Sequence, residues 1–74
     1  MEFLKYAKSE NLPLHVTITD GKDRRFFKYT VDELKKSIKR YCAWYNTTEA
    51  SKAYTDYGET ISLANGITFD VILY

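Results

Sequence analysis

The sequence predicts a small α+β domain in which helices cover one face of a four-stranded antiparallel sheet. Three observations carry this prediction: apolar and polar residues alternate over 14–19, a capping box precedes an amphipathic stretch at 31–45, and Asn65-Gly66 lies between two β-rich runs. The expected order of elements is α-β-β-α-α-β-β. Four strands in this order can form one sheet with the helices on one side.

The first expected element is a short helix, because apolar residues recur at helical spacing from Phe3 to Ala7. It should end between Ser9 and Asn11, since the residue before Pro13 is disfavoured in the helical region. The alternation over 14–19 then predicts a half-buried strand. Turn residues follow at 20–23, and 25–29 is the expected returning strand of a hairpin.

The second expected helix spans 31–45. The Thr30 hydroxyl can accept from the Glu33 amide while the Glu33 carboxylate accepts from the Thr30 amide, which is the capping-box arrangement. At 100° per residue, one arc of the helix is apolar and is expected to face the core. This arc comprises Val31, Leu34, Ile38, Tyr41, Cys42 and Tyr45.

A third helix is expected after residue 48, because apolar residues repeat at i, i+3, i+4 and i+7 from Ala50 to Tyr57. Asn46, Thr47 and Thr48 offer capping side chains before it, and Gly58 has the position of a C′ glycine after it. The segment is either a separate helix or the bent end of the preceding one.

The last expected element is a hairpin around Asn65-Gly66. A two-residue loop would place the apolar residues of its two strands on different faces. A three-residue loop at 64–66 with a left-handed Gly66 instead sets Ile61 opposite Phe69, so that both strands share one apolar face. We therefore predict the three-residue loop, with Ile67, Phe69, Val71 and Leu73 facing the core and Ile72 and Tyr74 facing outward.

Composition favours one folded domain over residues 1–74. The chain is 45% hydrophobic and 16% aromatic, which is well above the range of disordered segments. Its apolar runs, such as Tyr41 to Tyr45 and Val71 to Tyr74, are far short of the roughly 20 residues that a membrane span needs. No signal peptide is recognisable, so the expected location is cytoplasmic.

The residue types that catalysis requires are scarce. His15 and Cys42 are the single histidine and the single cysteine. The predicted strand directs His15 away from the core and the predicted helix directs Cys42 into it, so the two are not expected to act together. The glycines are isolated turn residues and form no phosphate-binding loop. Asp56, Glu59 and Asp70 form a loose acidic group that is more simply explained as solvated surface than as a divalent-metal site. We expect no catalytic residue, no metal site and no cofactor.

Positive charge is concentrated in the centre of the chain, although the net charge is only +1. Residues 22–40 hold eight basic and three acidic residues, a net charge of +5, whereas residues 1–21 carry −1 and residues 41–74 carry −3. The candidate binding residues lie on the exposed side of the 31–45 helix and on the strand before it. They are Arg24, Arg25, Lys28, Lys35, Lys36, Lys39, Arg40 and, beside them, Trp44.

Two kinds of partner fit these residues. The preferred hypothesis is a larger protein or nucleoprotein complex, because tyrosine and tryptophan are enriched at interface centres and the chain has seven tyrosines. A second copy of the chain, docked on the last strand through Ile72 and Tyr74, is one version of this hypothesis. The alternative is DNA or RNA, with phosphates on the basic helix face and a base stacked on Trp44 and on Phe26 or Phe27.

No segment carries a family signature. In size, in tyrosine and lysine usage and in the lack of catalytic residues, the chain is similar to small accessory proteins of phages and mobile elements, among them anti-CRISPR inhibitors. This likeness is one of class and not of motif. It implies a binding or inhibitory role without catalysis.

Overall fold

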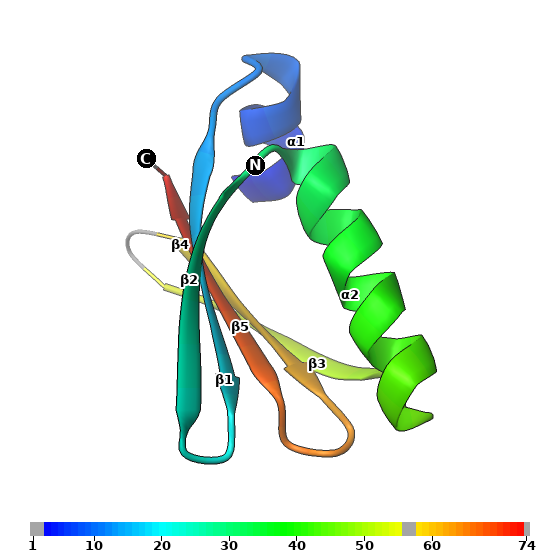
Figure 1. The fold of residues 1–74 in the computed structure, drawn as a ribbon. Coiled ribbons are helices and arrows are strands. Elements are labelled where there is room, and N and C mark those ends of the chain that lie inside the picture. Colours follow the sequence, from blue (N-terminus) through cyan, green and yellow to red (C-terminus); the bar gives the residue numbers. More distant parts are fainter. Residues whose placement is uncertain (1–2, 56–57, 74) are drawn as a thin grey trace.

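The fold is a five-stranded antiparallel sheet with two helices on one of its faces (Figure 1). It is seen in a computed structural model that describes residues 3–55 and 58–73. The α+β class is confirmed, but the sheet has five strands and not four. The elements are α1 (Phe3–Ser9), β1 (Leu14–Asp20), β2 (Asp23–Tyr29), α2 (Val31–Tyr45), β3 (Glu49–Tyr54), β4 (Gly58–Leu63) and β5 (Thr68–Leu73).

Helix α1 ends where the sequence predicts. Asn11 adopts a left-handed conformation with φ of +52°, and the Leu12 N–H donates to the Ala7 carbonyl at 2.8 Å. The Asn11 N–H donates to the carbonyl of Lys8 at 3.1 Å, so the two bonds form a Schellman ending. This turn directs the chain from α1 into β1.

The β1–β2 hairpin is closed by a two-residue loop. Asp20 pairs with Asp23, and Gly21 lies at the first loop position with φ of +62°. A left-handed residue at that position is what a type II′ turn requires, and glycine adopts it without steric cost. The predicted hairpin is confirmed, with its second strand extended to Asp23.

Helix α2 begins with the predicted capping box. The Thr30 Oγ1 accepts from the Glu33 N–H at 3.2 Å, and the Thr30 N–H donates to Glu33 Oε1 at 2.9 Å. The helix ends at Asn46, whose φ of +50° turns the chain out of the helix. The predicted apolar stripe is buried as far as Tyr41, but Cys42 is only partly buried and Tyr45, which was expected to face the core, is 49% exposed.

The prediction of a third helix is wrong, because residues 49–54 form strand β3. This strand pairs antiparallel with β4, and a bulge interrupts the register between Glu49 and Ser51. All six of its residues are exposed. The free edge of β4 supplies backbone hydrogen bonds along the whole segment, and these outweigh a weak helical periodicity that has no core to face.

Gly58 is likewise not a helix cap but the first residue of β4, where it pairs with Ile72 of β5. It is buried, and a Cβ at this position would meet the Val71 carbonyl oxygen. Glycine is therefore needed here for the close approach of two backbones.

The register of the last hairpin is as predicted. Ile61 pairs with Phe69, and the Leu63 N–H donates to the Ile67 carbonyl at 2.8 Å around a loop in which Gly66 has φ of +97°. Ile67, Phe69 and Val71 are buried. Leu73 lies opposite Leu14 on the same side of the sheet, but it is 37% exposed because it stands at the end of its strand.

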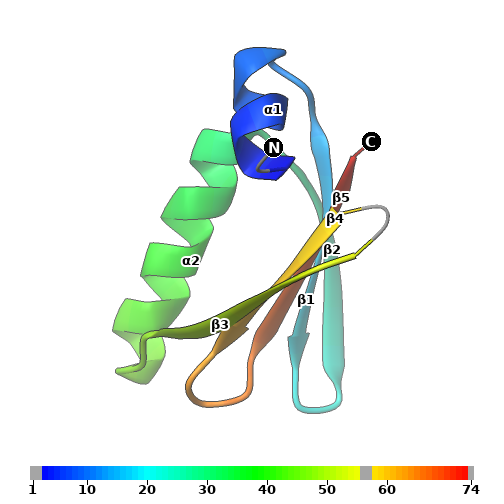
Figure 2. The same cartoon turned by 180° about the vertical axis from the view of Figure 1, so that it is seen from behind.

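The strand order is β2-β1-β5-β4-β3, so the last strand in the sequence occupies the centre of the sheet. Helix α2 connects β2 at one edge with β3 at the other, and α1 lies on the same side as α2 (Figures 1 and 2). The core lies between the helices and this inner face of the sheet. Its largest fully buried side chains are Phe69, Leu14, Ile18, Leu34, Ile61, Val16 and Val71. No helix of residues 3–55 and 58–73 covers the outer face (Figures 1 and 2).

Candidate functional site

The residues considered for catalysis do not converge. His15 pairs in register with Lys28 and Ile72 on the outer face of the sheet, whereas Cys42 lies on α2 at the inner face. Glu59 is buried on the inner face, and Asp70 on the outer face accepts a hydrogen bond from the Thr60 hydroxyl at 2.7 Å. Asp56 lies outside the described residues.

The basic candidate residues do not lie on a single surface of the protein. Arg24 and Lys28 pair with outward-facing residues of β1 and so belong to the outer face of the sheet, while Arg25 pairs with Ile18 on the inner face. Lys35 and Lys39 line a groove between α2 and β3. The remaining two, Lys36 and Arg40, lie on the exposed side of α2. The structure therefore does not join all of these residues into one basic surface.

Trp44 is the centre of a compact group that the structure does bring together. Its side chain is 64% exposed, yet the ring lies 5.5 Å from the ring of Tyr41 and the Arg40 guanidinium lies 5.9 Å from its centroid. Tyr41 in turn packs edge-on against Phe69 at 5.5 Å. A continuous set of aromatic contacts thus supports an exposed indole ring from the core.

A small crevice of about 70 Å³ extends this group to the β1–β2 hairpin, and Arg25, Trp44 and Tyr45 are among its lining residues. The Tyr45 hydroxyl donates to Asp20 Oδ2 at 3.0 Å. This hydrogen bond and the negative charge of the Asp20 carboxylate raise the pKa of Tyr45 above its ordinary value of 10.0. The bond ties the end of α2 to the hairpin.

We call Arg25, Lys36, Arg40, Trp44 and Tyr45 the Trp44 surface. Lys36, Arg40 and Trp44 follow one another at intervals of four residues and so share one side of α2. Arg25 reaches the same region from β2. Chemically, this surface offers one large amphipathic ring between the cationic Arg25 and Arg40, and Asp20 and Asp23 also line the crevice beside it. Its cationic part is the side of α2 that carries Lys36 and Arg40, which suits an acidic surface or an unpaired base.

Further exposed apolar side chains lie on the outer face of the sheet. Phe26 is 74% exposed and pairs with Thr17, and Ile72 is 44% exposed and pairs with His15. The outward direction of Ile72 is confirmed, and Tyr74 lies outside the described residues. Because β5 is paired on both sides, a second copy cannot add to its edge. At β5, a second copy could therefore pack only against the face of the sheet.

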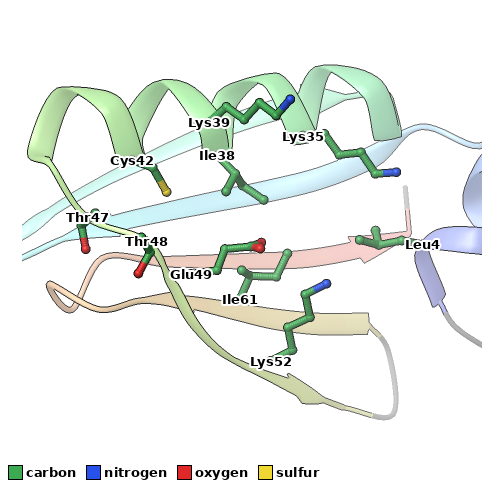
Figure 3. Close-up of a pocket in the computed structure, with 10 residues that line it drawn as sticks. All are labelled: Leu4, Lys35, Ile38, Lys39, Cys42, Thr47, Thr48, Glu49, Lys52 and Ile61. Atoms are coloured by element: carbon green, nitrogen blue, oxygen red, sulfur yellow. The ribbon is translucent and has the colours of Figure 1, made fainter.

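A larger groove of about 480 Å³ lies on the inner face between α2 and β3 (Figure 3). Ile38 and Ile61 give it an apolar floor, and Leu4 of α1 lies at one end. Three lysines and one glutamate also line it, namely Lys35, Lys39, Lys52 and Glu49. Lys52 rises from β3 toward α2, and Lys35 extends toward the end at which Leu4 lies.

Sequence reasoning missed this groove because it placed residues 49–54 in a helix. The bulge between Glu49 and Ser51 sets Glu49 opposite Leu63 and Lys52 opposite Ile61, which are both core-facing residues of β4. Both side chains therefore belong to the groove side of the sheet. No pattern in the sequence marks such a bulge, because it depends on pairing with a distant strand.

The comparisons with family models, curated proteins and solved structures found no match to this chain. Within residues 3–55 and 58–73, no helix has the length and apolar character that crossing a membrane requires. The same part of the chain holds no cluster of three or more histidine, cysteine or acidic residues placed to ligate a metal.

Proposed function

We propose that this chain is a binding protein without catalytic activity, which docks through the Trp44 surface on an acidic surface of a larger protein or protein complex. The observation that carries the proposal is the exposure of Trp44 together with its support by Tyr41 and Arg40. An accessory or inhibitory role, as in the small phage proteins to which the chain is similar in class, agrees with this mode of action.

The residue types of the Trp44 surface favour tight binding. Tryptophan, tyrosine and arginine are the residues that most often dominate binding energy, because they bury a large area around few rotatable bonds. The contacts of Trp44 with Tyr41 and Arg40 already restrict its ring in the free protein, so less conformational entropy is lost on binding. Lys36 and Arg40 add charge complementarity to an acidic partner.

The test is affinity capture with three proteins in parallel: wild type, Trp44→Ala, and the charge reversal Lys36→Glu with Arg40→Glu. The matched control is Lys22→Glu with Arg24→Glu, which makes the same charge change near the hairpin turn and on the outer face. We expect one species to be retained by wild type and control and lost from the other two variants. Its affinity for Trp44→Ala, measured after identification, should fall by about 30-fold or more.

Retention of the captured species by Trp44→Ala and by the α2 charge reversal, or equal loss from the control, would refute the proposal. Circular dichroism melting of every variant separates lost binding from lost folding. Because the two α2 substitutions lie on exposed positions, their melting temperatures should stay close to wild type.

Nucleic acid is the second candidate partner, since an exposed indole beside two cationic side chains can also stack on an unpaired base. Trp44 and Phe26 cannot form one stacking surface for such bases, because Phe26 lies on the opposite side of the sheet from Trp44. Fluorescence anisotropy with labelled single-stranded DNA, duplex DNA and RNA at about 50 and 200 mM salt decides between the partners. Tight, salt-sensitive binding that is lost in the α2 charge reversal would identify nucleic acid.

A further inference from the structure

The groove between α2 and β3 has the chemistry of a ligand site separate from the Trp44 surface. Its volume of about 480 Å³ is within the range of small-molecule pockets. Its floor is apolar, and Ile61 is 1% exposed, so it belongs to the rigid core. A ligand here would rest on a preformed surface.

The charges around the floor are unbalanced. Lys35, Lys39 and Lys52 contribute three positive charges and Glu49 one negative charge. Among the residues that the structure describes, no salt bridge joins Glu49 to a groove lysine. The ammonium groups therefore keep their hydrogen-bonding capacity for an incoming anion.

We propose that this groove binds a small organic anion with an apolar body, such as an acyl carboxylate. The anionic group would lie between Lys35 on α2 and Lys52, which rises from β3 toward α2 (Figure 3). The apolar body would contact the partly exposed Leu4 and Cys42 above the buried Ile38 and Ile61. Inorganic phosphate would leave Leu4 and Cys42 without an apolar contact, and a neutral hydrocarbon would leave the lysines without a partner.

Cys42 provides an internal reporter for occupancy. It is the single cysteine of the chain, it is partly exposed, and its sulfur points from α2 into the groove. A ligand over the floor should hinder access of a thiol reagent to this sulfur. This readout does not depend on any partner of the Trp44 surface, so it is independent of the proposed function.

The experiment measures the reaction rate of Cys42 with a disulfide reagent in the presence of decanoate or decanol, together with displacement of anilinonaphthalene sulfonate. Decanoate should slow labelling of the thiol and displace the dye, and decanol should do so much more weakly. The variant Lys35→Glu with Lys52→Glu should bind decanoate about tenfold more weakly or worse, because two charge-assisted contacts become repulsive. The control Lys22→Glu with Arg24→Glu should match wild type.

Three results would overturn the proposal. The first is labelling of Cys42 that decanoate does not slow, and the second is equal protection by decanol and decanoate. The third is displacement of the dye by an acidic extended peptide but not by decanoate, which would instead indicate strand addition at the free edge of β3. Circular dichroism of the Lys35 and Lys52 variant shows whether it folds, and Lys35→Ala with Lys52→Ala provides a milder second variant.

Discussion

Two phenylalanines in different strands allow a direct test of which face of the sheet forms the core. Phe69 of β5 is fully buried beneath α2, where its ring meets that of Tyr41 edge-on at 5.5 Å. Phe26 of β2 is 74% exposed on the outer face. The substitutions Phe69→Ala and Phe26→Ala remove the same atoms from opposite sides of one sheet.

The two substitutions should differ widely in cost. Truncating a fully buried phenylalanine to alanine typically costs about 3–5 kcal/mol, because the ring is lost and a cavity remains. At about 0.05–0.15 kcal/mol per residue, this chain of 74 residues has roughly 4–11 kcal/mol of stability in total. Phe69→Ala therefore removes about a quarter of the stability or more, whereas Phe26→Ala should stay within about 0.5 kcal/mol of wild type.

Urea and thermal denaturation, followed by circular dichroism and by the fluorescence of Trp44, would measure both effects. For a domain of this size each kcal/mol lowers the melting temperature by about 4–8 °C, so Phe69→Ala should melt at least about 12 °C lower or be unfolded at room temperature. Equal losses for the two variants, or a larger loss for Phe26→Ala, would refute the placement of the helices over the Phe69 side.

Three further predictions concern local contacts. Thr30→Ala removes the N-cap of α2 and should cost about 1 kcal/mol in urea denaturation, and a cost near zero would contradict the capping box. The tyrosinate absorbance of Tyr45, identified as the part of the signal that is missing in Tyr45→Phe, should titrate above pH 10, and Asp20→Asn should bring its midpoint back toward the ordinary value. Because the pKa of Tyr45 is raised in the folded protein, the stabilisation from this hydrogen bond is present below pH 10 and is lost as the pH rises through that midpoint. Gly58→Ala forces a methyl group against the Val71 carbonyl and should destabilise the fold by about 1–3 kcal/mol, whereas a neutral effect in thermal melting would mean that the two strands do not approach so closely.

Sequence reasoning succeeded where the signals were local. The capping box at Thr30 and the three-residue loop ending at Gly66 are set by residues within a few positions of each other. Which side chains of β5 face the core could be predicted in the same way, because only one hairpin register places Ile61 and Phe69 on a common side. Such features depend little on the rest of the fold.

It failed at β3, where the local signal is misleading. Residues 49–54 combine alanine, lysine, serine and glutamate, which are not typical of strands, and all of them are exposed, so no alternation marks a buried face. Their conformation is decided by the free edge of β4. The Trp44 group was partly predictable, since Arg40 and Trp44 are four residues apart on a helix, but the approach of Arg25 required the hairpin to be placed in space. The groove was not predictable, because one of its walls is β3.

The central position of β5 has a consequence for how the chain folds. Leu14 pairs with Leu73, so the contact that joins the two halves of the sheet closes a loop of nearly the whole sequence. Until β5 is in place, the β1–β2 hairpin and the β3–β4 hairpin are linked only through α2, and neither has a complete hydrophobic layer beneath it. Folding should therefore be slow and all-or-none for so short a chain, since the entropy of closing that loop is lost before most of the core can form. On the ribosome, helix and hairpins would emerge early, but the native sheet would assemble only after β5 has left the exit tunnel.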